Sequence, residues 1–288
     1  MSRESLSPSP QALDTFESDD GLLAYRDVGP WDGVPLVLLH SGFVDHTQFD
    51  DLVPGLVADG YRVIAPDARG HGWSANATRP FRQVDDLAAV LRHVDLGGPA
   101  VLVGLSMGAL IAIDTALEYP DSVRGLIVSG WGMCAPDLSD PWSAALQEAQ
   151  SQALAAGDIP RWLDAFAAWA PGPSRTLADV DPELIRRIKD MALRTLMKHT
   201  PDEPDYRVPV DNVAARARNI AVPVLAVNGP LDVPGVLAGV AALVDAVPDG
   251  RGVRLEGTAH YAAMERPEAF GEIVAEFVRA LPDRPASG

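Results

Sequence analysis

The chain has 288 residues, 47% of them hydrophobic and 22% charged, which is enough apolar material for one large α/β domain or two average domains. Its formal net charge at pH 7 is −17. Nucleic acid and anionic membranes repel such an acidic surface, so we expect neither as a partner. The single cysteine, Cys134, excludes an intrachain disulfide, and its apolar context after Trp131 and Met133 favours a buried structural thiol.

No segment of the sequence has the pattern of a targeting or membrane-spanning segment. The N-terminal stretch MSRESLSPSPQALD is polar, holds two prolines and lacks the apolar core of a signal peptide. No run elsewhere approaches the roughly 20 apolar residues that a membrane-spanning helix needs. We therefore expect a cytoplasmic protein.

Short apolar runs alternate along the chain with stretches that have helical spacing. The first run, 21–29, alternates polar and apolar residues, as an antiparallel edge strand does. Later runs rich in Val, Leu and Ile lack this alternation, which is typical of strands buried on both faces, and they lie at 35–40, 61–67, 100–106, 124–130, 222–229 and 252–257. Helix-like stretches follow most of them, at 47–60, 81–98, 107–120, 235–247 and 267–281. The sequence therefore predicts an α/β fold of three layers around a mostly parallel sheet.

One interval, from about residue 133 to 212, contains no strand-like run. Its helix-compatible segments at 142–157, 159–170 and 182–200 are separated by turns that hold Pro or Gly. We expect a helical cap inserted between two strands, which divides the chain into a first core part, the cap and a second core part at 1–131, 132–212 and 213–288. Aromatic side chains gather here, and they either pack the helices together or line a cleft: Trp142, Trp162, Phe166 and Trp169, with Trp131 where the interval begins.

The segment VLVGLSMGALIA (101–112) places one serine, Ser106, between two glycines, with a predicted strand before it and a predicted helix after it. In a G-x-S-x-G turn of this kind the chain reverses sharply, and glycines are needed where a Cβ atom would clash. The serine hydroxyl then stands at the N-terminus of the helix, where the helix dipole favours developing negative charge. This pattern predicts that Ser106 is a catalytic nucleophile.

A serine nucleophile needs a histidine base and a carboxylate that orients the histidine. Asp232 follows the run at 222–229 and His260 follows the run at 252–257, so both are expected at the edge of the sheet where Ser106 lies. The order Ser, Asp, His is the order known for this type of turn. Asp137, which follows an earlier strand, stays open as the alternative acid. Other histidines lie at strand ends, in loops or on predicted helices, at His40, His46, His71, His93 and His199.

Five segments together carry a resemblance: LLHSGF (38–43), DARGHGWS (67–74), GLSMG (104–108), NGPLD (228–232) and GTAHYAAMERPEAF (257–270). On these residues the sequence resembles the α/β-hydrolase superfamily from about residue 20 to residue 280. Within it the chain is similar to the group of 3-oxoadipate enol-lactonases, small carboxylesterases and cofactor-free haloperoxidases. The resemblance implies an eight-stranded, mostly parallel sheet with the cap after the sixth strand.

The resemblance also implies where an oxyanion would bind. The backbone N–H of Met107, directly after the nucleophile, is one expected donor, and Gly42 occupies the family's second donor position. Ser41 stands where the family usually has glycine, which leaves Phe43 as a rival donor. The Ser41 side chain either contacts the substrate or holds the turn, and we favour the turn. His40, Asp67 and Arg69 are expected to be structural.

These parts predict a serine hydrolase that acts on a carboxylic ester or lactone of a small to medium-sized substrate, without a metal or an organic cofactor. The partner is then a small ester, lactone or thioester, and a homo-oligomer stays open. Haloperoxidase or perhydrolase chemistry, thioesterase or acyltransferase activity, and ligand binding with little turnover are the alternatives. We expect the substrate to contact residues of the first loop and of the cap: Ser41, Phe43, Trp131, Trp162, Phe166 and Trp169.

Overall fold

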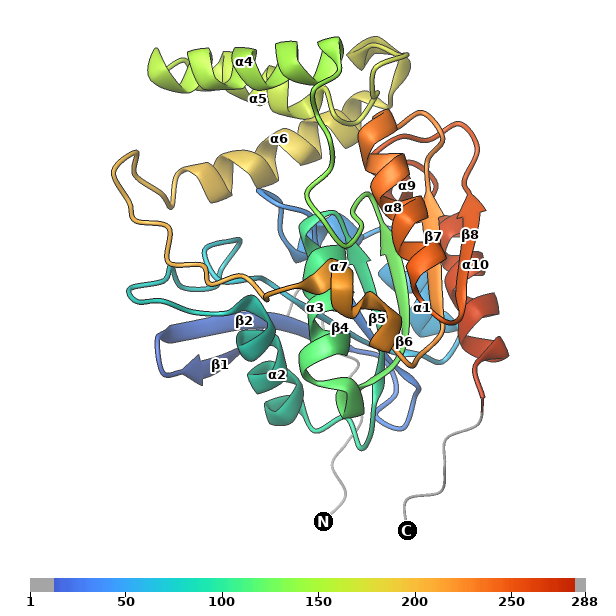
Figure 1. Cartoon of the computed structure of the whole chain (residues 1–288). Coiled ribbons are helices and arrows are strands. Elements are labelled where there is room, and N and C mark those ends of the chain that lie inside the picture. Colours follow the sequence, from blue (N-terminus) through green and yellow to red (C-terminus); the bar gives the residue numbers. More distant parts are fainter. Residues whose placement is uncertain (1–12, 283–288) are drawn as a thin grey trace.

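The computed structural model describes residues 13–282, and the N-terminal stretch behind the expectation of no signal peptide lies almost wholly outside this range. One sheet of eight strands forms the centre of the molecule, in the order β1-β2-β4-β3-β5-β6-β7-β8 (Figure 1). The strands from β4 to β8 are parallel, whereas β2 is antiparallel to both β1 and β4. In chain order they are β1 Asp14–Ser18, β2 Gly21–Val28, β3 Pro35–Leu39, β4 Arg62–Pro66, β5 Ala100–Leu105, β6 Val123–Ser129, β7 Val224–Asn228 and β8 Gly250–Arg254.

Helices cover both faces of this sheet. Alternate residues of the buried strands face opposite sides, so that Leu102 belongs to the hydrophobic cluster on one face of the sheet and Val103 to the cluster on the other. Every residue of β3, β4 and β5 is buried, as a central parallel sheet requires. The helices of the two outer layers are α1 Val53–Ala58, α2 Gln83–Val94, α3 Met107–Glu118, α8 Pro234–Ala246 and α10 Pro267–Ala280. The predicted three-layer α/β fold is therefore confirmed.

Short helical turns complete the outer layers. They are the α-helical turns α7 Val213–Arg216 and α9 Ala262–Glu265 and the 3₁₀ turns η1 His46–Phe49, η2 Pro120–Ser122, η3 Leu177–Asp179 and η4 Ala217–Asn219. None of the helices within residues 13–282 is long and apolar enough to cross a membrane.

Three helices form a cap between β6 and β7, above the sheet in Figure 1: α4 Pro141–Ala155, α5 Ile159–Ala167 and α6 Pro182–Leu196. An aspartate begins each of them by accepting backbone N–H groups of the first turn, and proline follows in that turn, which is a strong start signal. The cap has its own hydrophobic cluster, which includes Trp162 and Ile188. Val44, Tyr261 and Met264 of the core belong to this same cluster, so the cap is packed directly onto the core.

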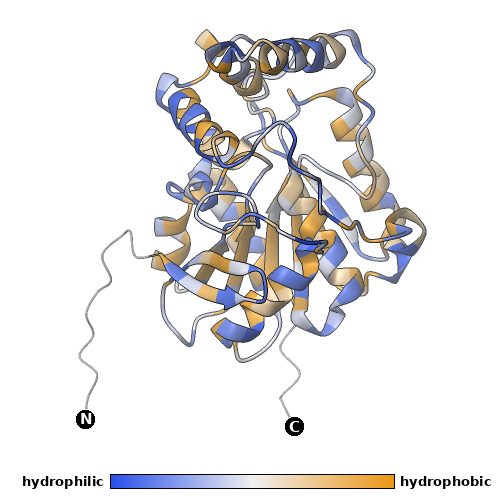
Figure 2. Cartoon of the chain, turned by 90° about the vertical axis from the view of Figure 1, so that its left-hand side faces the viewer, coloured by the Kyte–Doolittle hydropathy of each residue, from blue (hydrophilic) through white to orange (hydrophobic). Residues whose placement is uncertain are grey.

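The distribution of hydropathy explains why the two edges of the sheet were predicted incorrectly. Figure 2 shows hydrophobic residues concentrated in the central strands. The strand predicted as an edge, now β2, is flanked by β1, whose short sequence DTFES gives little apolar signal. At the other edge, β8 begins two residues earlier than predicted and is largely exposed, because no further strand covers it.

Cys134 is exposed, so the prediction of a buried thiol was wrong. After β6 the chain passes over the outside of α8, where a groove is lined by residues 133–137 and by residues of that helix between Pro234 and Ala242. The approach is close: a Cβ atom on Gly235 would lie 1.7 Å from the carbonyl oxygen of Asp137. The apolar residues before Cys134 pack inward, whereas Cys134 itself faces solvent.

Candidate active site

Ser106 lies between β5 and α3 in a backbone conformation that L-amino acids rarely adopt, with φ 53° and ψ −114°. Two neighbouring glycines make this turn sterically feasible. A Cβ atom on Gly104 would lie 2.3 Å from the carbonyl oxygen of Gly108, and one on Gly108 would lie 2.0 Å from that of Leu39. Ser106 N–H donates to the carbonyl oxygen of Ser129 at 2.7 Å, which ties the turn to the end of β6.

The Ser106 side chain is partly exposed at the start of α3, a helix of 12 residues. It makes no hydrogen bond that caps the helix, and within residues 13–282 the structure gives its hydroxyl no other hydrogen-bond partner. The N-terminal N–H groups and the dipole of α3 favour negative charge at this position. The hydroxyl is therefore available to a reactant.

His260 and Asp232 form a buried pair. Nδ1 of His260 lies 2.8 Å from Oδ2 of Asp232, and Oδ1 of Asp232 accepts the N–H of Val233 at 2.7 Å. Burial of the imidazole opposes its protonation, but the charge and hydrogen bond of Asp232 outweigh this effect and hold the pKa of His260 above its ordinary value of 6.5. Asp137, the alternative acid, is not hydrogen-bonded to this pair; its carboxylate accepts the backbone N–H of Ser139.

The end of β6 brings the histidine to the side of the sheet where Ser106 lies. A Cβ atom on Gly130 would lie 2.9 Å from Cε1 of His260, so the imidazole is in close contact with the residue after Ser129. Ser129 is the residue that accepts the N–H of Ser106. The structure thus gathers Ser106, Asp232 and His260 at one edge of the sheet, without a hydrogen bond between Ser106 and His260. Such bonds are often long in enzymes without substrate.

The turn that holds Gly42 lies against Met107. A Cβ atom on Gly42 would be 3.8 Å from Cβ of Met107, an ordinary van der Waals contact. Ser41 is buried, its N–H donates to Oε1 of Gln48 at 2.9 Å, and its hydroxyl accepts from Nε2 of Gln48 at 3.1 Å. The Ser41 side chain therefore holds the turn. Gln48 was not singled out in the sequence, because its position has no motif.

Aromatic side chains of the cap reach the two loops that carry these groups. Phe43, with φ 61° and a side chain 39% exposed, packs against Trp162 and Phe166 with ring centroids 5.2 and 5.7 Å apart. Trp162 and Phe166 are buried and stack on each other. Trp169 is only partly buried, and its ring centroid lies 5.3 Å from that of His260. Of the cap aromatics predicted to meet substrate, Trp169 is thus the least enclosed by other side chains.

Trp131, directly after Gly130, is partly buried and packs toward the α3 side of the sheet. Its indole N–H is inaccessible to solvent and has no hydrogen-bond partner among the described residues. Trp131 and Met107 therefore pack against the same hydrophobic cluster, on one face of the sheet.

His40 and His71 are occupied with structural contacts. His40 Nδ1 lies 2.8 Å from the carbonyl oxygen of Ser41, and its Nε2 accepts the N–H of Ala68 at 2.9 Å. Burial lowers the pKa of His40, and burial together with the nearby His40 lowers the pKa of His71 to about 3. Both rings are therefore neutral; His40 connects two loops, and Nδ1 of His71 lies 3.1 Å from the carbonyl oxygen of Arg69 in its own loop.

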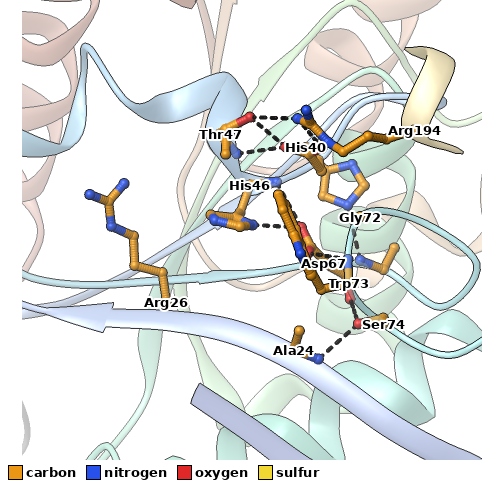
Figure 3. A network of polar contacts seen from close by, with 12 residues as sticks. Ala24, Arg26, His40, His46, Thr47, Asp67, Gly72, Trp73, Ser74 and Arg194 are labelled. Atoms are coloured by element: carbon orange, nitrogen blue, oxygen red, sulfur yellow. Dashed lines mark hydrogen bonds and ion pairs between the residues drawn. The ribbon is translucent and has the colours of Figure 1, made fainter. Parts of the chain in front are cut away.

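Asp45, His46 and Asp67 form a buried cluster whose ligand atoms lie within 4.8 Å of one another. Figure 3 shows His46 and Asp67 of this cluster with Arg194 of α6 nearby. Asp67 Oδ1 accepts both the backbone N–H and Nδ1 of His46, and its Oδ2 accepts the N–H of Trp73. Asp45 is bonded to Thr47 and to Arg194 of α6. Because protein groups, including an arginine, already occupy these oxygens, the cluster fits a structural network better than a metal site.

Comparison with known proteins agrees with the fold. The sequence is 31% identical over 269 residues to a Mycobacterium tuberculosis protein provisionally named non-heme bromoperoxidase BpoC, covering 90% of this chain and 98% of that protein. It is also 34% identical over 140 residues to an AB hydrolase superfamily protein of Gibberella zeae, of which it spans about half, 49%.

Solved structures show the same fold at lower identity. The esterase RhEst1 from Rhodococcus sp. ECU1013 superposes with a TM-score of 0.75 at 24% identity, covering 94% of this chain and 100% of that one. The enol-lactonase from Burkholderia xenovorans LB400 superposes with a TM-score of 0.70 at 22% identity, covering 92% and 100%. The sequence profile of the alpha/beta hydrolase family matches residues 36–273, which is most of the chain. The chain belongs to the alpha/beta hydrolase family.

Proposed function

We propose that this chain is a serine hydrolase that cleaves a carboxylic ester or lactone of a small to medium-sized substrate. The observation that carries the proposal is the meeting of three segments at one edge of the sheet. Ser106 stands in a strained turn at the N-terminus of α3, and the buried pair of His260 and Asp232 contacts the neighbouring strand end. Strained backbone at such a position is typical of a functional site.

In the proposed reaction the Ser106 hydroxyl attacks the substrate carbonyl while Nε2 of His260 accepts its proton. Asp232 holds the other ring nitrogen and stabilises the imidazolium that forms. The developing oxyanion accepts hydrogen bonds from the N–H groups of Met107 and Gly42, whose turns lie in contact. Ser41 N–H cannot serve as a donor in this arrangement, because Gln48 already accepts it.

His260 then gives its proton to the leaving alcohol, or to the alkoxide of an opened lactone, and an acyl-enzyme remains on Ser106. Deprotonation of a water by His260 and its attack on the acyl carbonyl release the acid and restore Ser106. These steps need neither a metal nor an organic cofactor. The exposed Phe43 and the partly buried Trp169 favour an apolar acyl group over a charged one.

A fluorophosphonate probe and a panel of short-chain p-nitrophenyl esters, lactones and thioesters test the proposal. We expect the wild type to be labelled once and to hydrolyse at least one ester or lactone, and Ser106→Ala to lose labelling and about 10⁴-fold or more of the rate. Ser151→Ala, an exposed serine on α4, is the matched control and should behave as wild type. If Ser106→Ala still hydrolyses the substrate, Ser106 is not the nucleophile. Labelling without turnover on any of these substrates would favour a ligand-binding protein.

Perhydrolysis is the second candidate, and its support is the similarity to BpoC over nearly that whole protein. Hydrogen peroxide would take the place of water, and its attack on the acyl-enzyme would release a peracid and free Ser106. Adding peroxide and bromide to the ester assay tests this reaction, since a peracid oxidises bromide. Bromination that depends on Ser106 and on the ester supports perhydrolysis, and ester hydrolysis without bromination supports hydrolysis alone.

A further inference from the structure

The turn that holds Gly42 is fixed from two sides by the core. On one side, His40 bridges the carbonyl oxygen of Ser41 and the N–H of Ala68. On the other side, the backbone N–H of His46 donates to Asp67 at 2.8 Å. Between these anchors lie Gly42, Phe43 and Val44, and the backbone of Phe43 has a positive φ of 61°. A segment in such a conformation persists only when its surroundings hold it.

Asp45 ends this segment and is completely buried. Its Oδ1 accepts the N–H of Thr47 at 3.0 Å and so begins the turn η1. Its Oδ2 accepts two hydrogen bonds from Arg194, from Nε at 3.0 Å and from a terminal nitrogen at 2.7 Å. Arg194 lies on α6, so a cap helix supplies the positive charge that this buried carboxylate needs.

Arg194 is also held in place. Its guanidinium carbon lies 5.1 Å from the centre of the Trp73 ring, and Trp73 N–H is bonded to Asp67. Asp67 is the same residue that anchors His46. The cap arginine and the core carboxylate therefore form one connected network around residues 45–47.

Other contacts join α6 to the core but end at different groups. Arg187 binds the carbonyl oxygen of Thr47 and the exposed Asp51. Lys198, just after the helix, donates to the carbonyl oxygens of Gly72 and Ser74 at 3.0 and 2.6 Å. Neither is bonded to Asp45, so among the described residues Arg194 is the cap cation that pairs with the carboxylate next to this segment.

We propose that Arg194 is a positioning residue which, through Asp45, couples the seating of the cap to the placement of the Gly42 N–H in the oxyanion site. This inference rests on the proposed hydrolase function. Removal of the guanidinium leaves a buried carboxylate without its cation, and the segment 42–45 relaxes toward solvent to relieve that cost. When the Gly42 N–H moves slightly away from the oxyanion position, the hydrogen bond that forms in the transition state weakens. The rate of the chemical step then falls more than substrate binding does.

Arg194→Met is compared with Arg186→Met, its control on the same helix. Arg186 is exposed, and among residues 13–282 its ion pairs are those with Glu183 and Asp190 of α6. We expect Arg194→Met to lower kcat for the best ester about 10- to 100-fold with KM changed less than about threefold, and Arg186→Met to leave both unchanged. Arg194→Lys, which keeps the charge but loses the forked geometry, should fall between Arg194→Met and the wild type.

Two further measurements separate positioning from a general loss of structure. Guanidinium ion at millimolar concentration should restore part of the kcat of Arg194→Met, because the site is open to solvent on the arginine side, and it should not change Arg186→Met. Amide hydrogen exchange should speed up at residues 42–46 in Arg194→Met and stay as in wild type elsewhere in the core.

Equal kcat values for Arg194→Met and Arg186→Met would overturn the coupling, as would a loss of kcat that guanidinium does not restore together with exchange raised throughout the core. If the wild type hydrolyses no ester, lactone or thioester, the proposed function fails instead. Hydrogen exchange at 42–46 then still decides whether Arg194 holds this segment.

Discussion

Nδ1 of His260 lies 2.8 Å from Oδ2 of Asp232, and both side chains are almost completely buried. The pair raises the pKa of His260 above 6.5, and the general base must be neutral to accept the Ser106 proton. The rate therefore falls as pH falls through this pKa. We expect the acid limb of kcat/KM for ester hydrolysis to have its midpoint above 6.5.

Asp232→Asn removes the charge that raises this pKa. We expect its acid limb to move to lower pH and its kcat to fall about 10³- to 10⁴-fold, because the imidazole loses both its orientation and its counter-charge. Asp137→Asn is the control and should follow the wild-type profile. If Asp137→Asn shows the large loss and Asp232→Asn does not, Asp137 is the working acid.

Trp169 contacts the His260 ring with centroids 5.3 Å apart, close enough for an aromatic ring to favour the imidazolium. Trp169→Leu should shift the acid limb to lower pH and reduce kcat about 3- to 10-fold, whereas Trp169→Phe should retain most of both. Trp31→Leu, which removes an exposed tryptophan that lies on Arg62, should leave the profile unchanged. An identical acid limb in Trp169→Leu and wild type would exclude this role.

Gly108→Ala should destabilise the protein strongly. The added Cβ atom would lie 2.0 Å from the carbonyl oxygen of Leu39, so β3 and α3 would have to separate. We expect the free energy of unfolding in urea to fall by about 3 kcal/mol or more. Gly239→Ala in α8, where a Cβ atom meets nothing within 4 Å, should raise it by about 0.5–1 kcal/mol. Equal stabilities of the two variants would contradict the close approach.

Asp114 on α3 is buried, and its Oδ1 has no hydrogen-bond partner among the described residues. Burial, with a smaller contribution from Glu118, raises the pKa of Asp114 to about 7. The folded state therefore holds this proton more tightly than the unfolded state, and the free energy of unfolding falls as pH rises from the ordinary value of 3.8 toward about 7.

Asp114→Asn removes this dependence. At about pH 8 we expect the variant to be more stable than wild type by on the order of 2 kcal/mol, and at about pH 4 the two should be alike. Urea unfolding across this range measures the difference, with the exposed Asp245→Asn as control. Parallel curves for Asp114→Asn and wild type would show that Asp114 ionises as an ordinary surface acid.

The exposed Cys134 predicts a simple chemical result. The native protein should react with Ellman's reagent at one thiol per chain without denaturant, because the only cysteine is at the surface. Reaction that begins only after unfolding would indicate a buried thiol.

The fold and the reactive turn were predictable because their signals are local. Ser106 lies between two apolar segments of adjacent chain, and the glycines beside it are required by contacts within the same turn and with β3. Asp232 and His260 were located from their positions after successive strands, since parallel strands end at the same edge of a sheet.

Other features depend on contacts that the sequence does not reveal. Arg194 and Asp45 are 149 residues apart, and no spacing rule connects a helix surface to a buried carboxylate across that distance. The edge strands β1 and β8 are short and exposed, so they bury few of the apolar residues that make a strand recognisable: β1 was not predicted, and β8 was predicted with shifted bounds. Cys134 was misjudged because apolar neighbours do not determine which side of a loop faces solvent.

Val44, Tyr261 and Met264 come from the core but complete the hydrophobic cluster of the cap. A cap transplanted from a relative would therefore have to pack against three core side chains that fit the native cap. A chimera would need matching residues at these three positions. Tyr261 is one peptide bond from His260, so a poorly fitting graft would also displace the imidazole of the proposed general base. An exchange of caps is thus constrained by the core residues that pack against the cap, and not only by the residues proposed to meet the substrate.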